Sequence, residues 1–411
     1  MGGGMAASGT DGAWPEGGAP FRERPWHRRW LAAQADRLWA FHGTGAIDPR
    51  GGFHALDAAG RPLPGRPRPL HATTRMVHCH AVGHLLGRPG SDAVVDHGMR
   101  ALLHHHRDAR HGGFHWSFDA DGPVDDRKRA YGHSFVLLAA ASATMAGHPD
   151  GPELLAEIAE LHEARFWDEA VGMGREDFAR DWSEPEPYRG QNSNMHLAEA
   201  LIGAHEATGE EAFLDRARRI ATRLIDGHAR AAGWVVPEHY DAGWREDRGY
   251  VGDPMFRPSG TTPGHALEWA RLLTLLAATP AGEGWMAGAA GALFDAACGM
   301  AWDADRGGFV YTLGWDGRPT RTFRLWWPLA EGAAAASVLG REGWYRRVWS
   351  VIARDAIDAE TGAWRPELDP ADPPIFEGRP DLYHALGACL TPLAPPDRTI
   401  VRAAADGTLA P

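Results

Sequence analysis

The sequence has few cysteines and no long apolar run, and both absences narrow the class of protein. Its three cysteines, Cys79, Cys298 and Cys389, show no paired spacing in 411 residues. That argues against a disulfide framework and for a reducing compartment. No apolar stretch approaches the length of a membrane span, and the N-terminus lacks the apolar segment of a signal peptide. We therefore expect a cytoplasmic protein without a membrane partner.

The chain also has fewer basic than acidic residues. The chain has 42 Lys and Arg against 54 Asp and Glu, which gives a net charge of −12. Such a balance argues against nucleic acid or an anionic membrane surface as partner. No phosphate-binding loop and no dinucleotide fingerprint is present, so we expect no nucleotide cofactor.

The chain is rich in hydrophobic residues and in tryptophan. A hydrophobic content of 44% is enough for a large core, and 18 tryptophans offer faces that stack on sugar rings or pack inside. Residues 1–20 are rich in Gly and Ala, and we expect a disordered tail there. Residues 21–400 are expected to form a single catalytic domain, followed by a C-terminal tail at 401–411.

Six short turn segments recur along the chain at intervals of about 55 to 75 residues, which leaves room for two helices per unit. They read as tight β-hairpins or loops. The segments are Pro49–His54, Arg110–His115, Ala170–Gly174, Ala232–Val235, Asp305–Val310 and Glu360–Trp364.

Apolar residues at helical spacing fill the intervals between these turns. The expected helices are Trp26–Phe41, Arg75–Leu86, Asp92–His106, Tyr131–Ala146, Glu153–Phe166, Met195–Thr208, Glu211–His228, His265–Ala278, Trp285–Met300, Leu329–Leu339, Gly343–Ala356 and Leu382–Leu390. Twelve helices in six pairs predict an all-α fold, an (α/α)6 barrel with short β-hairpins in its loops.

One stretch, Arg257–Trp269, has features of a catalytic site. Thr262 is a candidate helix cap, Pro263 suits the first helical position, and His265 then falls in the first turn. The positive end of a helix dipole disfavours protonation of an imidazole, and a neutral imidazole is what a general base needs. Glu268 lies three residues on and shares the helix face of His265.

The same design recurs at other helix starts. Asp381 is a candidate cap before His384, and Ser193 a candidate cap before His196. In a ring of helix pairs, the second helix of each pair begins at the same end of the barrel. Polar groups at these starts would then form one constellation: Arg75 with His78, then His133, His196, His265, Glu331 and His384.

At these motifs the chain resembles the N-acylglucosamine 2-epimerase superfamily, a group of (α/α)6 barrels that includes mannose isomerases, sulfoquinovose isomerases and cellobiose 2-epimerases. The resemblance rests on Thr74–His78, Asn192–Glu199, Thr262–Trp269 and Asp381–Leu386, and it extends from Trp26 to Pro395. It implies that His265 and His384 are the acid/base pair. It also implies a sugar site lined by Arg75, Asn192, His196, Glu268 and Glu331, with Trp326 and Trp327 in its wall.

The segment from Phe256 to His265 is most similar to the aldose–ketose isomerase branch, which implies that D-mannose and D-fructose are interconverted through a cis-enediol. Pro380 offers no side-chain donor to a sulfonate, so we expect an unmodified hexose. In this scheme His384 moves the proton that opens the ring, and His265 carries the C2 proton to C1. Arg75 and His196 would stabilise charge on the enediol oxygens, and the glutamates would orient histidines or bind hydroxyls.

The scheme requires no metal. Histidines also cluster at 104–106 and at His78 with His80, but adjacent helical residues point in different directions, so we expect no metal site there.

Other functions stay open at the level of sequence. A sugar 2-epimerase needs bases on both faces of C2, which His265 and His384 could supply. An (α/α)6 glycoside hydrolase needs two carboxylates, for which Glu268 and Glu331 are candidates. A non-catalytic sugar-binding protein would not need the histidine pair. A homo-oligomer is compatible with the sequence.

Overall fold

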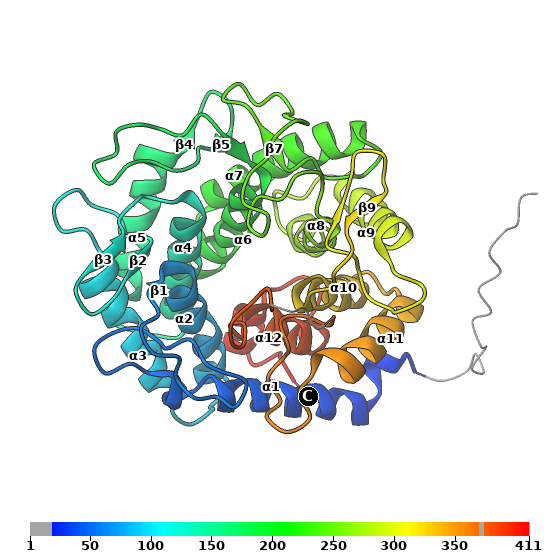
Figure 1. The fold of residues 1–411 in the computed structure, drawn as a ribbon, viewed down its shortest axis with the longest axis horizontal. Coiled ribbons are helices and arrows are strands. Elements are labelled where there is room, and N and C mark those ends of the chain that lie inside the picture. Colours follow the sequence, from blue (N-terminus) through cyan, green and yellow to red (C-terminus); the bar gives the residue numbers. More distant parts are fainter. Residues whose placement is uncertain (1–18, 370–373, 411) are drawn as a thin grey trace, which may run out of the picture.

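The computed structural model describes residues 19–369 and 374–410 and confirms the (α/α)6 architecture. The expected disordered tail covers residues 1–20, of which residues 1–18 lie outside the described residues. Six inner helices ring the barrel axis (Figure 1): α2 (Leu70–Leu85), α4 (Ala130–Met145), α6 (Gln191–Thr208), α8 (Pro263–Ala277), α10 (Trp326–Val338) and α12 (Tyr383–Leu390). Six outer helices surround them: α1 (Pro25–Phe41), α3 (Ser91–Ala101), α5 (Gly151–Leu161), α7 (Glu211–Ala221), α9 (Met286–Ala301) and α11 (Glu342–Val351).

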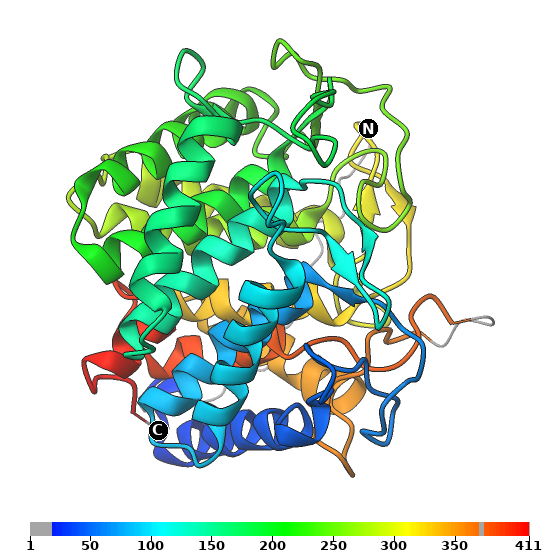
Figure 2. The same cartoon turned by 90° about the vertical axis from the view of Figure 1, so that its left-hand side faces the viewer.

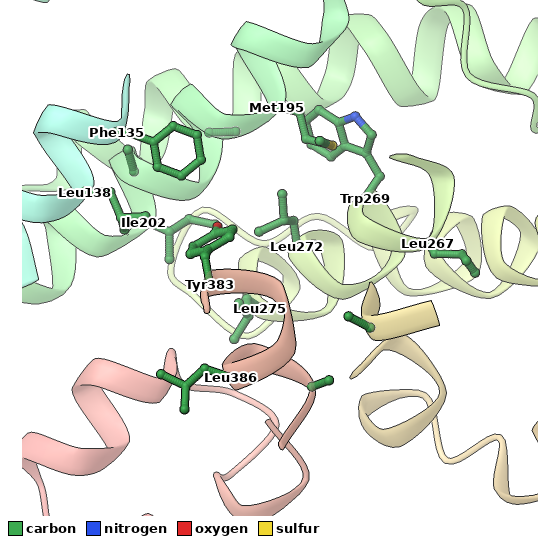
Figure 3. Close-up of a cluster of buried hydrophobic side chains, with 14 of the residues drawn as sticks. Phe135, Leu138, Met195, Ile202, Leu267, Trp269, Leu272, Leu275, Tyr383 and Leu386 are labelled. Carbon is green, nitrogen blue, oxygen red and sulfur yellow. The ribbon is translucent and has the colours of Figure 1, made fainter. Parts of the chain in front are cut away.

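The two rings differ in sequence because they differ in burial. An inner helix packs against two inner neighbours and an outer partner, so its residues are buried on nearly every side. In α4 every residue from 132 to 143 is buried. Outer helices such as α7 bury one face only and carry charges on the other. Figure 3 shows part of the core, where side chains of α4, α6, α8 and α12 meet around Ile202, Leu272 and Tyr383.

Four outer helices end in a π-helical turn that leads into the next loop: η3 (Leu102–His106), η4 (His162–Phe166), η5 (Thr222–Ala229) and η6 (Ile352–Ala356). Single 3-10 turns make up η1 (Phe21–Glu23), η2 (Thr44–Ala46) and η7 (Thr391–Leu393). Five of the six recurring turns lie between paired strand residues, as at Arg107 with Phe114. In that turn Gly112 and Gly113 have φ values of +73° and +68°, a conformation that favours glycine.

The strands are short and antiparallel. They are β1 (Arg68–Pro69), β2 (Ser117–Phe118), β3 (Pro123–Asp125), β4 (Trp167–Asp168), β5 (Met173–Gly174), β6 (Arg189–Gly190), β7 (His239–Tyr240), β8 (Thr312–Leu313) and β9 (Pro319–Arg321). β1, β2 and β3 form one sheet, and β4–β5, β6–β7 and β8–β9 pair in twos.

Short paired strands or single β-bridges, rather than side-chain caps, come directly before several of the inner helices. α2 follows β1 directly, α6 follows β6, and α10 follows the bridge between Leu325 and Glu367. The predicted capping was therefore wrong at two sites. The hydroxyl of Thr262, the residue before α8, makes no capping bond, and Ser193 lies inside α6 and donates to Glu176. Asp381 does accept a hydrogen bond from the Tyr383 backbone at 3.1 Å, although α12 begins only at Tyr383.

The C-terminal end departs from the predicted tail. Ile400–Ala405 forms a further helix, α13, which buries Val401, Ala403 and Ala404 against α2, α4 and α6. The hydroxyl of Thr399 caps it by accepting from Arg402 at 3.2 Å. Figure 2 shows this segment at one end of the barrel and the hairpins at the other. Within the described ranges, no helix has the length and apolar character needed to cross a bilayer.

Candidate active site

The second and sixth residues of the inner helices supply much of the lining of one central cavity, to which His265, the third residue of α8, also belongs. The second and sixth residues of a helix lie four apart, so they share one face. The second residues are His71, Tyr131, Asn192, Gly264, Trp327 and His384, and the sixth are Arg75, Phe135, His196, Glu268, Glu331 and Ala388. Seven of the eight predicted site residues line one central cavity of about 110 Å³: Arg75, Asn192, His196, His265, Glu268, Trp327 and His384. Trp326 lines it as well.

His265 is held by a carboxylate. Its Nδ1 lies 2.9 and 3.0 Å from the two carboxylate oxygens of Glu238, which precedes β7. Glu238 also accepts from the Thr262 backbone at 3.2 Å and from the Gln191 side chain at 2.9 Å. Burial alone would raise the pKa of Glu238, but His265 and its other partners hold it below the ordinary value. An ionised Glu238 can only accept, so His265 Nδ1 carries the proton and Nε2 is left with a free lone pair.

His384 has the same arrangement. Its Nδ1 lies 2.8 Å from Glu331 Oε1, and the other oxygen of Glu331 accepts from Arg271 Nε at 3.0 Å. Glu331 therefore lies behind His384, where it orients the histidine, and does not line the cavity. The Trp327 ring contacts both imidazoles, with centroids 5.2 Å from His265 and 5.8 Å from His384. Two carboxylate–histidine pairs thus meet across one indole.

Arg75 provides a fixed positive charge at the cavity wall. It donates to Asp381 and to the Tyr131 hydroxyl, each at 2.9 Å, and lies over the rings of Phe135 and Tyr383. Burial disfavours the charge, but Asp381 outweighs it and raises the pKa of Arg75. The guanidinium is therefore ionised at any physiological pH.

His196 lies in the second turn of α6, one turn deeper than predicted. Burial lowers its pKa to about 4, so it is neutral at pH 7 because it is buried rather than because it sits at a helix start. Asn192 is one turn nearer the start of α6, and its buried side-chain oxygen has no hydrogen-bond partner in the part of the chain that the structure describes. That oxygen is available to a ligand hydroxyl.

Below the histidines lies a group of three buried carboxylates and one arginine, which we call the floor: Glu199, Glu268, Glu331 and Arg271. Arg271 donates to Glu331 at 3.0 Å and to Glu199 at 3.1 Å, and it lies 3.7 Å from Glu268. Tyr383 also donates to Glu199.

The floor brings together two sets of side chains with the spacing of metal ligands. They are His196, Glu199 and Glu268, and Glu268, Glu331 and His384, and the ligating atoms of each set lie within 4.8 Å. We do not assign them as ligands, because Arg271 and His384 already hold both oxygens of Glu331, and Arg271 and Tyr383 hold both oxygens of Glu199. A divalent ion would have to break these bonds.

Several predicted residues lie elsewhere. His133 is buried away from the cavity, between the backbone of Phe114 and the carbonyl of Arg129. His78 lies on the far side of the floor and bonds to Ser142. His80 and His106 bond to backbone carbonyls, and His104 is exposed.

Sequence reasoning missed Glu238, Arg271 and the role of Glu199. Arg271 continues the helical face of His265 and Glu268 at a spacing of three, a signal that the sequence did contain. Glu238 lies outside any helix, and nothing in its local pattern distinguishes it.

Comparison with known proteins agrees with this geometry. The chain is 45% identical to a D-mannose isomerase of Thermobifida fusca over 386 residues, which covers 90% of this chain and 95% of that protein. It is 42% identical to a D-mannose isomerase of Pseudomonas cannabina pv. alisalensis over 391 residues, covering 90% and 94%. A crystal structure of a D-mannose isomerase matches with a TM-score of 0.84 and 31% identity over 93% of this chain and 99% of that one. Residues 51–388 match the sequence profile of the N-acylglucosamine 2-epimerase (GlcNAc 2-epimerase) family, and the chain belongs to that family.

Proposed function

We propose that the protein is an aldose–ketose isomerase that interconverts D-mannose and D-fructose through a cis-enediol, with His265 and His384 as its acid/base groups. The observation that carries the proposal is the meeting of two carboxylate–histidine pairs at one cavity, with an indole in contact with both rings. The relatives named D-mannose isomerase support the choice of sugar.

The reaction begins with ring opening. His384 shuttles the proton between O1 and O5, so that the pyranose becomes the open-chain aldehyde. Glu331 holds Nδ1 of His384, which leaves Nε2 to exchange the proton. The ionised Glu331 also stabilises the imidazolium that forms when His384 accepts it.

Isomerisation then moves one proton between neighbouring carbons. Nε2 of His265 takes the proton from C2, the C1–C2 enediol forms, and the same nitrogen returns the proton to C1. The hydroxyl proton of O2 passes to O1, so the aldehyde becomes a hydroxyl and C2 becomes the ketone. Arg75 stabilises negative charge on these oxygens, and neutral His196 contributes a hydrogen bond.

The alternatives fit the site less well. A glycoside hydrolase needs two carboxylates that are free to act on the bond. Both oxygens of Glu331 are already engaged by His384 and Arg271. A 2-epimerase would use the same two histidines on opposite faces of C2, so it differs from the isomerase in product rather than in residues.

Incubation of the purified protein with D-mannose in D2O, followed by NMR of the sugars, tests the proposal. We expect D-fructose as the first product, with deuterium at C1 whenever the His265 proton exchanges before its return. Formation of D-glucose faster than D-fructose would identify a 2-epimerase, and no conversion of either kind would reject the enzyme assignment.

A further inference from the structure

Glu268 is an unusual carboxyl group in the floor. It is 1% exposed and lines the central cavity. Among the described residues neither of its oxygens has a hydrogen-bond partner, and Arg271 and His196 each lie 3.7 Å from Oε1. A buried ionised carboxylate without hydrogen bonds is costly, whereas a buried carboxylic acid costs much less and can donate. The side chain is therefore built to meet a ligand rather than a neighbour.

The arrangement of charge in the floor separates Glu268 from the other two carboxylates. Within residues 19–369 and 374–410, Arg271 is the only guanidinium that donates to them, and it uses its hydrogen bonds on Glu331 and Glu199. Both of these also bond to a further donor, Glu331 to His384 and Glu199 to Tyr383. Two neighbouring negative charges are thus fixed, and they oppose a third on Glu268.

We propose that Glu268 acts as a neutral carboxylic acid that donates a hydrogen bond to a sugar oxygen, and that Arg271 is the positioning residue that places the proton on Glu268 rather than on Glu331 or Glu199. Arg271 does so indirectly, because it holds the two neighbouring carboxylates in their ionised form. This inference rests on the proposed function for the identity of the ligand, a hexose, but not for the protonation of Glu268.

The titratable and charged groups around Glu268 support this assignment. Burial raises the pKa of Glu268 well above its ordinary value, and the charges of Glu331 and Glu199 raise it further, while Arg271 and Arg75 lower it. The groups that face it from the surrounding helices are Arg75 of α2, Tyr131 of α4, His196 and Glu199 of α6, Arg271 of α8, Glu331 of α10, and Tyr383 and His384 of α12.

A neutral acid at this position suits the proposed reaction. It lies on the same helix face as His265, one turn deeper into the barrel. Its proton can stabilise charge that develops on a sugar oxygen during proton transfer at C2, as a preorganised donor does in a dry site. An ionised glutamate at the same place would repel that charge.

The test replaces Glu268 by glutamine, which keeps a donor but cannot ionise, and by alanine, which has no donor. We expect Glu268→Gln to keep kcat/KM for mannose within about tenfold at pH 7, and Glu268→Ala to lose about 10²- to 10³-fold. Since the wild-type donor is lost as the pH rises through the raised pKa of Glu268, the wild type should lose activity on the alkaline side. Glu268→Gln should not show that loss.

The same substitution at Glu238 serves as the matched control. Glu238 must be ionised to hold His265, so Glu238→Gln should lose about 10²-fold or more. If Glu268→Gln is as inactive as Glu268→Ala while the wild type isomerises mannose, the neutral-acid role is wrong. If the wild type isomerises no mannose, the proposed function fails, and the protonation of Glu268 is decided by spectroscopy.

Infrared difference spectroscopy reads protonation without any substrate. At pH 7 the wild type should show the carbonyl stretch of a protonated carboxylic acid that disappears in Glu268→Gln. Glu176→Gln is the control and should leave that band in place. Glu176 is also buried, with its pKa raised by burial to about 7, but it lies outside the floor. Should Glu268→Gln fail to fold, Glu268→Met gives the same subtraction. The absence of the band in a folded pair overturns the inference.

The positioning role of Arg271 has its own readout. Arg271 lowers the pKa of Glu331, so Arg271→Met should raise that pKa and move the acidic limb of kcat/KM to higher pH. Arg271→Lys, which keeps the charge, should restore the limb toward its wild-type position. Loss of activity at all pH values with no movement of the limb would show that Arg271 is only structural.

Discussion

At the scale of single residues, the two histidines have the same support but different expected tasks. Each donates from Nδ1 to a buried glutamate, Glu238 for His265 and Glu331 for His384, so each presents Nε2 as the reactive nitrogen. A carboxylate that orients an imidazole and stabilises its cation is a common device for general acid–base catalysis. What separates the two histidines is the proton that each one moves.

We expect His265→Ala to abolish turnover of both mannose and an acyclic analogue that cannot form a ring, since it removes the base at C2. His384→Ala should lose about 10²- to 10⁴-fold on mannose, because it removes assisted ring opening. It should keep much of its rate on the acyclic analogue. Rates for each variant on both sugars, with products identified, check this.

The exposed His104 supplies a control, because His104→Ala should leave both rates unchanged. Equal loss in His265→Ala and His384→Ala on the acyclic sugar would mean that both histidines act on the C2 proton, as in an epimerase.

At the scale of helices and loops, the sequence predicted the existence of all twelve barrel helices but placed several starts too late. Arg75, Met195 and Leu329 were the expected first residues where the helices begin at Leu70, Gln191 and Trp326. The helical turns that the prediction left out come directly after short strands. The pairing partner of such a strand is distant in sequence, as β7 is from β6. Local capping signals cannot reveal such pairing.

That shift matters for the site, because Arg75 and His196 are then the sixth residues of their helices rather than residues of the first turn. The histidine pair and Arg75 were predictable from spacing and resemblance. Glu238 was not, because a residue beside a two-residue strand has no periodicity to read. His133 was included wrongly because it shares a helix start with Tyr131, which is the residue that faces the cavity.

The loops that carry the site are anchored by buried ion pairs. Asp108, in the hairpin after η3, accepts from the fully buried Lys128 at 2.9 Å and from Arg180 at 2.9 Å. Lys128 pairs with Phe178 just before α4. The pair therefore ties the hairpin that follows α3 to the start of the helix that carries Tyr131.

Asp108→Asn should destabilise the protein by about 3 kcal/mol, because it leaves the charge of Lys128 buried without its partner. Urea unfolding followed by circular dichroism measures the change. Asp121→Asn, at an exposed position of the next turn, is the control and should change the free energy of unfolding by less than about 0.5 kcal/mol. Equal stability of both variants would contradict the anchoring role of Asp108.

At the scale of the whole molecule, the barrel gathers acidic groups from three inner helices and two loop positions and balances them with its own cations. Arg271 joins Glu199 of α6 to Glu331 of α10, and Arg75 of α2 pairs with Asp381 at the entrance to α12. These contacts link neighbouring inner helices of the ring (Figure 1), and the pair of Arg75 and Asp381 joins segments that are far apart in sequence. The balance of charge at the centre of the barrel therefore depends on contacts that form only when the helices close into a ring.

This balance leads to a prediction about metal. In sugar isomerases that use a divalent ion, the ion neutralises clustered carboxylates and polarises the sugar oxygens. Here Arg271 and His384 already bind Glu331, and Arg75 supplies positive charge at the cavity. We therefore expect activity on mannose to survive exhaustive dialysis against EDTA, and added Mg²⁺, Mn²⁺ or Co²⁺ to change kcat/KM by less than about twofold, far less than the several kcal/mol a catalytic ion supplies. Loss of activity with EDTA that is restored by one of these ions would show that the floor binds a metal after all, with Glu268 as the ligand common to both candidate sets.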